Sequence, residues 1–432
     1  MYLAINIIGV FVFLGVAFLF SKDKKAINWR SIAVVLVINL FLAWFFSSFS
    51  IGRDVVQAAA NGFEWLVNAS YKGIAFALPN WVSASLGTEI GGSLAKGSNM
   101  NFVTAALLPI LLIVPLFDIL TYIGVLPFII KWGGKGLSVI TGQPKFESFF
   151  AIEMMFLGNT EALAVSQLQL KSMKAQRNVT IAMMSMSCVT ASILGAYVGL
   201  MPGMYVITAV PLNVLNAIII TSLLNPVKID ASEDTIAKIG GSSVVESEDM
   251  EDGKKEPFFS FLGDSILGAG RLILIIAANV IAFVALAFLI DKILGLINPN
   301  LSLENILGVI MFPFAYLLGF NPEDAFKLAR LMGTKLVTNE FVVMGQVTKD
   351  VTAAVKANYQ GTGLYSRHFV AVLTVFLTSF ANFSTTGMII GAFKGIINRE
   401  GNDAISKSVP LMLLSGILVS LLSAGLIGIF SW

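Results

Sequence analysis

Two short polar islands, each carrying a glutamate, interrupt segments that are otherwise apolar enough to lie in a membrane. The first, residues 158–161, reads Gly-Asn-Thr-Glu and ends at Glu161. The second, residues 338–341, reads Thr-Asn-Glu-Phe and contains Glu340. An ionised side chain at hydrocarbon depth costs several kcal/mol, so it is retained where it lines a cavity or a pathway. The two islands therefore indicate a polar site inside a membrane protein.

The composition agrees with this interpretation and excludes several other classes. Of the 432 residues, 56% are hydrophobic and 12% are charged, whereas soluble domains have about 25% charged residues. Several apolar stretches reach the roughly 20 residues that a spanning helix needs. The net charge of +2, without a basic run, gives no sign of a nucleic-acid partner. A single cysteine, Cys188, and a single histidine, His368, provide neither a disulfide nor a usual zinc site.

The N-terminal part of the sequence predicts spans at residues 2–20 and 31–49, followed by an amphipathic interfacial helix at residues 51–81. The first apolar stretch lacks a basic start and a cleavage-like site, so we interpret it as a span and not as a signal peptide. Lysines and an arginine between the two spans predict a cytoplasmic loop, which puts the N-terminus outside. A third span is expected at residues 101–130, with a chain break at the glycine-rich residues 132–136.

The remaining sequence consists of two similar halves. Each half contains, in order, a polar island, a span broken by small polar residues and a Gly-Ala pair. The island segments, residues 146–170 and 325–347, are long enough to enter the membrane, turn and leave on the same side, which requires cover by protein or water. This order is typical of transporters with inverted repeats and broken helices around a midplane site. The predicted divisions are N-terminal spans with the interfacial helix (1–130), a first hairpin repeat (131–226), an acidic linker (227–257) and a second hairpin repeat with the remaining spans (258–432).

The chemistry of the islands predicts a site for a small molecule rich in hydroxyl groups and ring nitrogens, because amides donate and accept hydrogen bonds while carboxylates accept them. One wall is expected from Asn159, Thr160 and Glu161, and the other from Glu340, Asn382 and Thr385. Phe380 and Phe383 are expected to supply an apolar face for a flat ring. The alternative is that the glutamates form structural ion pairs, for example Glu340 with Lys335, or Glu153 with a basic neighbour.

Three segments carry a resemblance to a known family: residues 156–161 (FLGNTE), 333–342 (GTKLVTNEFV) and 379–384 (SFANFS). They look like the signature segments of the concentrative nucleoside transporters, and they occur in the family's order over most of the chain. The sequence is especially similar to the nucleoside permeases of Gram-positive bacteria, of the purine-nucleoside type. The resemblance implies an all-α polytopic membrane protein of about eight transmembrane helices and two re-entrant helical hairpins, with inverted repeats and with scaffold and transport domains.

The resemblance also implies how such a protein works. It implies a homotrimer in the bacterial cytoplasmic membrane, surrounded by lipid, whose transport domain moves against the scaffold to give alternating access. Residues 1–130 would belong mainly to the scaffold. Asn159, Thr160 and Glu161 would face the nucleobase; Glu340, Asn382 and Thr385 would hold the ribose; and Phe380 would lie against the base. No cofactor is implied besides a co-transported ion.

Two departures from the family pattern bear on substrate and ion. Many members have Gln where this chain has Asn159, and the shorter amide mildly favours purines. Sodium-coupled members have an ion-ligating Asn seven residues before the hairpin glutamate, where this chain has Met154, and a thioether is a poor ligand for a hard cation. We therefore expect proton symport, with Glu161 or Glu340 as the carrier. The alternative is sodium symport, in which Thr190 and Ser192 supply oxygen ligands.

The sequence disfavours two other classes of protein. An intramembrane enzyme is disfavoured because the sequence has no Gly-x-Ser-x-Gly or His-Glu-x-x-His motif and only the single His368. A channel would not accumulate its solute above equilibrium, so saturable uptake driven by an ion gradient distinguishes a transporter from both. We expect a transporter and not an enzyme.

Overall fold

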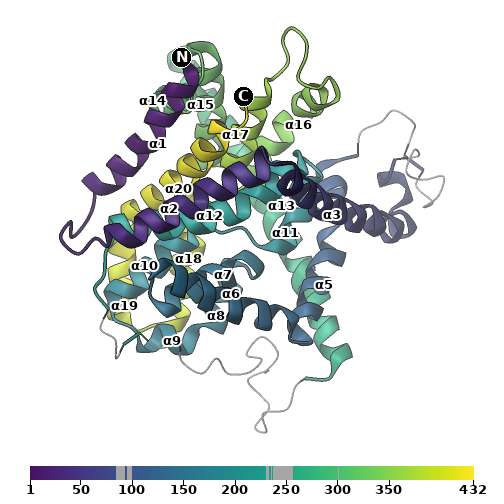
Figure 1. The fold of residues 1–432 in the computed structure, drawn as a ribbon. Coiled ribbons are helices and arrows are strands. Elements are labelled where there is room, and N and C mark those ends of the chain that lie inside the picture. The colour runs from purple at the N-terminus through teal and green to yellow at the C-terminus, as the bar shows by residue number, and fades with distance from the viewer. Residues whose placement is uncertain (84–92, 95–99, 230–232, 235, 237–255, 300) are drawn as a thin grey trace.

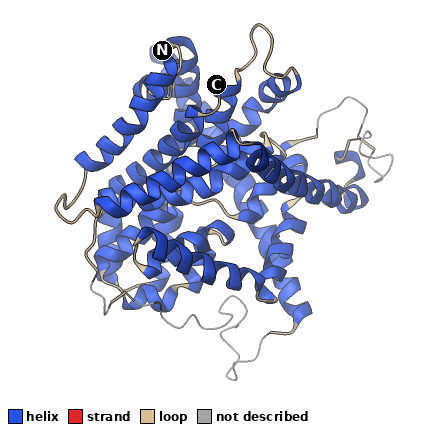
Figure 2. Cartoon of the chain, in the orientation of Figure 1, coloured by secondary structure: helices blue, strands red, loops and turns tan. Residues whose placement is uncertain are grey.

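The computed structural model describes residues 1–83, 93–94, 100–229, 233–234, 236, 256–299 and 301–432, and for residues 159–161 it describes the backbone alone. Over this part of the chain the regular structure is helical throughout, without a strand (Figures 1 and 2). The all-α fold predicted from the sequence is therefore confirmed.

Six helical stretches within the described residues are long and apolar enough to cross a membrane. They are α1 (Tyr2–Leu19), α2 (Trp29–Ser47), Val103–Tyr122, α12 (Gly203–Leu224), α13 (Phe258–Ile297) and α20 (Val409–Ile429). The third stretch consists of a π-helical turn, η2 (Val103–Leu107), followed by α5 (Ile110–Tyr122). The chain is thus a multi-pass membrane protein.

The predicted interfacial segment forms α3 (Ser50–Ala77), which a short 3₁₀ turn, η1 (Pro79–Trp81), follows. Helix α3 mixes charged and apolar residues along its length, and it exposes Trp65 and Phe76. Large exposed aromatic side chains on an amphipathic helix are typical of a membrane interface.

The expected third span is present but ends earlier than predicted, at Tyr122, and the expected break at residues 132–136 is wrong. The chain turns at Gly124, whose φ of 90° suits glycine, and α6 (Val125–Thr141) then runs without interruption through residues 132–136. Gly133 and Gly134 allow close packing instead of ending the helix. A Cβ atom on Gly134 would lie 2.7 Å from the Cα of Phe149 in α7 (Lys145–Phe156), so α6 and α7 pack nearly backbone to backbone.

Two of the apolar helices, α12 and α20, are largely buried inside the protein. Polar side chains join them to α2: the amide of Asn39 donates to Asn216 Oδ1 at 2.7 Å, and the Asn216 amide donates to Ser423 Oγ at 2.8 Å. Such interhelical hydrogen bonds replace the hydrophobic driving force that helices lack in lipid. The packed centre supports the broken helices on either side of it.

Both halves of the chain contain helices that are interrupted at the polar stretches. In the first half these are α7, α8 (Asn159–Val165), α9 (Gln167–Ser172), α10 (Ala175–Ser185) and α11 (Ala191–Val198). In the second half they are α14 (Leu303–Tyr316), α15 (Pro322–Val337), α16 (Glu340–Lys356), α17 (Arg367–Leu377), α18 (Phe383–Ile396) and α19 (Arg399–Lys407). The breaks between α7 and α8 and between α15 and α16 fall at the two islands. Those between α10 and α11 and between α17 and α18 fall at the small polar residues that follow.

Candidate functional site

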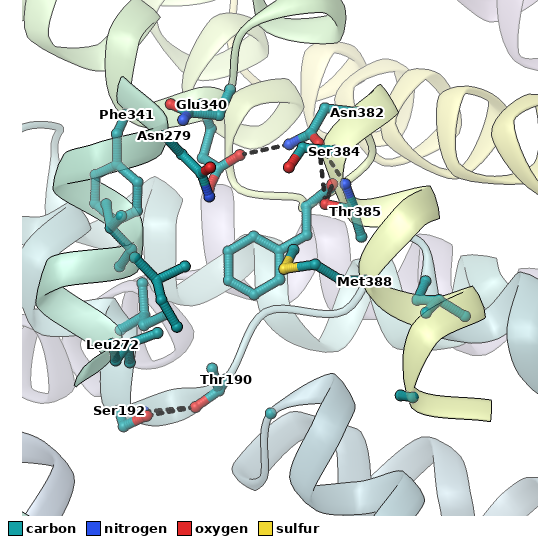
Figure 3. Close-up of a pocket in the computed structure, with 18 of the residues that line it drawn as sticks. Thr190, Ser192, Leu272, Asn279, Glu340, Phe341, Asn382, Ser384, Thr385 and Met388 are labelled. Atoms are coloured by element: carbon teal, nitrogen blue, oxygen red, sulfur yellow. Dashed lines mark hydrogen bonds between the residues drawn. The ribbon is translucent and has the colours of Figure 1, made fainter. Parts of the chain in front are cut away.

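A pocket lies where the helix breaks of the two halves meet. Its polar lining comes from both halves: Thr190, Ser192, Asn279, Glu340, Asn382 and Thr385 (Figure 3). Its apolar lining includes Leu272, Phe341, Phe380 and Met388. A mostly apolar cavity with a few convergent polar groups is the usual form of a small-molecule site.

Glu340 is the first residue of α16 and is almost completely buried. Both of its carboxylate oxygens accept hydrogen bonds: Oε1 from the hydroxyl of Tyr197 at 2.9 Å and Oε2 from the amide of Asn382 at 3.4 Å. Asn339 caps the same helix, because its Oδ1 accepts from the backbone N–H of Val342 at 3.1 Å. The positive end of a helix stabilises a nearby carboxylate, so the start of α16 is a favourable position for the Glu340 side chain.

Lys335 is fully buried and lies on α15, just before the second helix break. Its ammonium group stands 4.9 Å from the centre of the Phe376 ring, and it has no hydrogen-bond partner among the described residues. The described part of the chain contains no direct salt bridge between Lys335 and Glu340. The oxygens of Glu340 are therefore not taken up by a salt bridge among the described residues.

Asn382 and Thr385 form the start of α18. Asn382 Oδ1 accepts from the Thr385 backbone N–H at 2.8 Å and from its hydroxyl at 3.1 Å, which leaves the Asn382 amide N–H₂ for Glu340. Figure 3 shows these contacts as dashed lines between the labelled residues. Phe380 lines the same pocket, as the sequence predicts, but Phe383 is 55% exposed and does not. The expectation for Phe383 is wrong because α18 begins at that residue and turns its side chain away.

Thr190 and Ser192 lie on the other side of the pocket in Figure 3, at the break before α11. Thr190 caps α11 by accepting from the Ser192 backbone N–H at 3.1 Å, and the two hydroxyl oxygens are 2.6 Å apart. Met154, whose position suggested a loss of sodium binding, is buried in α7. Its backbone carbonyl accepts a contact from the Cys188 thiol at 2.6 Å.

The structure brings together most of the site residues predicted from the sequence. Thr190, Ser192, Glu340, Phe380, Asn382 and Thr385 all line one pocket. The side chains of Asn159, Thr160 and Glu161 lie outside the described residues, although Gly158 directly before them lines the pocket.

Tyr197 and Asn279 are polar residues at this site that the sequence analysis does not predict. Tyr197 contacts Glu340 across 143 residues of sequence, and Asn279 projects from the long apolar helix α13 into the pocket. Asn279 could have been identified from the sequence, because an amide in the middle of an apolar span is itself a polar interruption. Tyr197 could not have been identified in this way, because a tyrosine in an apolar helix is common.

Comparison with known proteins identifies the family. The family model described as "Na+ dependent nucleoside transporter C-terminus" matches residues 205–428, and the corresponding N-terminus model matches residues 8–81. The purine nucleoside transport protein NupG of Bacillus subtilis is 41% identical over 432 residues, which is 100% of both chains. This chain belongs to the concentrative nucleoside transporter family. The resemblance seen in the signature segments is thereby confirmed, and the protein is a nucleoside transporter, not an enzyme.

More distant members of the family agree. The nucleoside permease NupC of Helicobacter pylori is 26% identical, covering 98% of this chain and 97% of the permease. Among solved structures, CNTnw in an inward-facing substrate-bound state matches with a TM-score of 0.85 at 24% identity, over 100% of this chain and 98% of that chain. An outward-facing variant of CNTnw matches with a TM-score of 0.87 at 24% identity, over 100% and 99%. These likenesses establish the fold.

Proposed function

We propose that this family member is a symporter that takes up nucleosides into a bacterial cell, with a mild preference for purine nucleosides. The observation that carries the proposal is the joint lining of one pocket by both halves of the chain, with Glu340 and Asn382 on one side and Thr190 and Ser192 on the other. Paired acceptors suit the vicinal hydroxyls of ribose, and the apolar lining, including Phe380, suits a flat base. The shorter amide of Asn159 supports the purine preference, and so does the similarity to the purine nucleoside transport protein of Bacillus subtilis.

In this proposal the ribose is bound by Glu340, Asn382 and Thr385. The base is bound by Asn159, Thr160, Glu161 and Phe380. The broken helices around the pocket would belong to a transport domain that moves to give alternating access, with the two islands at the tips of re-entrant hairpins. Most of α13 is exposed and apolar, which supports contact with lipid and with further copies in a homotrimer. The protein would lie in the cytoplasmic membrane with its N-terminus outside, as the basic loop after α1 favours.

For the coupling ion we propose the proton, because Met154 offers a soft thioether where a hard cation needs oxygen. Glu161 and Glu340 are the carboxylates that the sequence suggests as carriers. A sodium ion is the second candidate. It is favoured by the Thr190 and Ser192 oxygens on the pocket wall and by the match to a family described as Na+ dependent.

Uptake of radiolabelled nucleosides into proteoliposomes tests the proposal. Proton and sodium gradients should be imposed separately, with inosine and uridine as substrates. Accumulation of nucleoside above equilibrium under a proton gradient is expected. Equilibration without accumulation under either gradient would contradict symport, and no uptake of any nucleoside would contradict the proposed substrate class.

A further inference from the structure

Helix α7 carries two buried glutamates whose surroundings differ. Glu147 is held on both oxygens by Arg177, with Nε to Oε1 at 2.6 Å and Nη2 to Oε2 at 2.7 Å. Glu153 is 1% exposed, and its Oε2 accepts a hydrogen bond from the Ser166 hydroxyl at 2.8 Å. No salt bridge reaches Glu153 within the described residues. Among the partners that the structure describes, Glu147 therefore has a cation and Glu153 has a neutral hydroxyl.

The other ionisable groups around α7 do not supply the missing charge. Helices α6, α8, α10, α11 and α12 pack against α7, and their titratable side chains are Lys131, Lys135, Glu161, Arg177, Tyr197 and Tyr205. The two lysines of α6 are exposed, and Arg177 is bound to Glu147. Tyr197 donates to Glu340, and the Tyr205 hydroxyl accepts from Arg367 at 3.2 Å. The Glu161 side chain is outside the described residues, and the nearby Cys188 thiol contacts the Met154 carbonyl.

This environment suits a neutral carboxylic acid. Burying an ionised carboxylate without a cation or several donors costs several kcal/mol. A protonated carboxyl group needs only a neutral hydrogen-bonding partner, and a serine hydroxyl can either donate to it or accept from it. In this conformation the buried surroundings of Glu153 therefore favour its protonated form, and its ionised form would need access to water.

The position of the Glu153–Ser166 contact ties protonation to the shape of the first island. The two residues are 13 apart in sequence, and a continuous helix would separate them by about 20 Å. Their hydrogen bond shows that the chain folds back between α7 and the end of α8, so the contact closes the base of the loop that carries residues 158–161. A proton on Glu153 stabilises the Glu153–Ser166 contact. Loss of that proton favours an arrangement in which water reaches the carboxylate.

We propose that Glu153, hydrogen-bonded to Ser166, is the site that binds the coupling proton, while Glu340 serves as a substrate ligand. The inference rests on the proposed proton-coupled uptake of nucleosides. A proton from the outside solution forms an O–H bond with a carboxylate oxygen of Glu153, travels with the nucleoside, and is released to the cytoplasmic solution. No other bond changes. Glu340 is the weaker candidate because it accepts hydrogen bonds from both Tyr197 and Asn382 at the N-terminal end of α16.

The test compares Glu153→Gln with the parent protein in proteoliposomes. The parent should accumulate nucleoside under an inward proton gradient, and its affinity should change with pH by up to about tenfold per unit, the limit for one linked proton. The variant should still exchange internal for external nucleoside, but its accumulation should fall to the equilibrium level and its affinity should not vary with pH. If the parent and Glu153→Gln both accumulate nucleoside under a proton gradient, the Glu153 assignment is wrong, while proton coupling and the proposed function stand. Sodium-driven accumulation by the parent overturns proton coupling, and no uptake by the parent overturns the proposed function itself.

A second pair of variants covers the case in which Glu153→Gln does not fold. Ser166→Ala removes the partner hydroxyl of Glu153, whereas Ser148→Ala removes a buried hydroxyl of α7 that has no partner among the described residues. Ser166→Ala should shift both the pH midpoint of accumulation and the carboxylic acid C=O stretching band in the infrared spectrum, and Ser148→Ala should shift neither. Identical pH profiles and spectra for Ser166→Ala and the parent would overturn the assignment.

Discussion

The hydroxyl of Tyr197 in α11 donates a 2.9 Å hydrogen bond to Oε1 of Glu340 in α16. The ring of Tyr197 packs edge-on against Phe341, with the ring centres 5.0 Å apart, so the hydroxyl is held rigidly toward the carboxylate. This contact joins a helix of the first half of the chain to the glutamate of the second half. It orients the carboxylate that we propose as a ribose ligand.

Tyr197→Phe should weaken riboside binding by about 1.5–3 kcal/mol, the usual value for a hydrogen bond to a charged group. The fully buried ring would keep its packing while Glu340 loses an orienting donor. Isothermal titration calorimetry in detergent measures the effect. Tyr205→Phe is the matched control, because that buried hydroxyl contacts Arg367 away from the pocket. Equal affinities for the Tyr197 variant and the parent would show that the contact does not position the ligand.

Glu340→Gln should abolish or severely weaken the transport of ribosides while the protein still folds. Hydrogen bonds to a carboxylate are about twice as strong as neutral ones, and glutamine replaces one acceptor oxygen by a donor. Nucleoside analogues without ribose hydroxyls should lose much less affinity, which separates a ribose contact from a general defect. Unchanged calorimetric binding of uridine and inosine would rule out the ribose assignment.

Asn159→Gln should shift preference toward pyrimidine nucleosides by about 1–3 kcal/mol, the scale for one mismatched group in a pocket. The longer side chain moves the amide forward by one methylene and reduces the space for a purine. Competition between inosine and uridine for uptake measures the change. The same inosine-to-uridine ratio in variant and parent would contradict the predicted role of this position.

Transport should follow the proton gradient and persist when choline replaces sodium, because Met154 offers no hard ligand. Met154→Asn should create partial sodium dependence if the Thr190 and Ser192 oxygens complete a site, since a ligand drives a conformational change only through differential affinity. Uptake at symmetric pH with an inward sodium gradient provides the decisive measurement. Accumulation by the parent under these conditions, insensitive to a protonophore, would establish sodium coupling instead.

Gly134→Ala should lower the stability of the protein, because the added Cβ would lie 2.7 Å from the Cα of Phe149 and force α6 away from α7. Overpacking of this kind costs about 1–3 kcal/mol. Gly136→Ala, in the same helix but with open space around its Cβ position, should instead be neutral or stabilising by about 0.5–1 kcal/mol. Thermal unfolding in detergent compares the two. Equal melting temperatures for the two variants would mean that the close approach of α6 to α7 is not required.

The sequence by itself determined the features that depend on local composition and spacing. Apolar stretches of spanning length predicted the long helices, because helix length and hydrophobicity are properties of one segment. The islands around Glu161 and Glu340 predicted the helix breaks, because polar groups and caps next to an apolar run interrupt it locally. Asn382 and Thr385, three residues apart, were recognisable as one cluster for the same reason.

Only the tertiary structure decided which distant side chains meet. The packing of α11 against its neighbours brings Tyr197 to Glu340, and neither residue type nor spacing reveals a partner 143 residues away. Glu147 and Glu153 are equivalent by sequence alone, yet one receives Arg177 and the other Ser166. The glycines around Gly134 suggested a helix break, because glycine permits both turns and close helix contacts. The backbone of Phe149 packs against Gly134, so here the glycine serves a close helix contact. These outcomes depend on the mutual approach of helices, which is fixed by packing across the whole protein and not by any single segment.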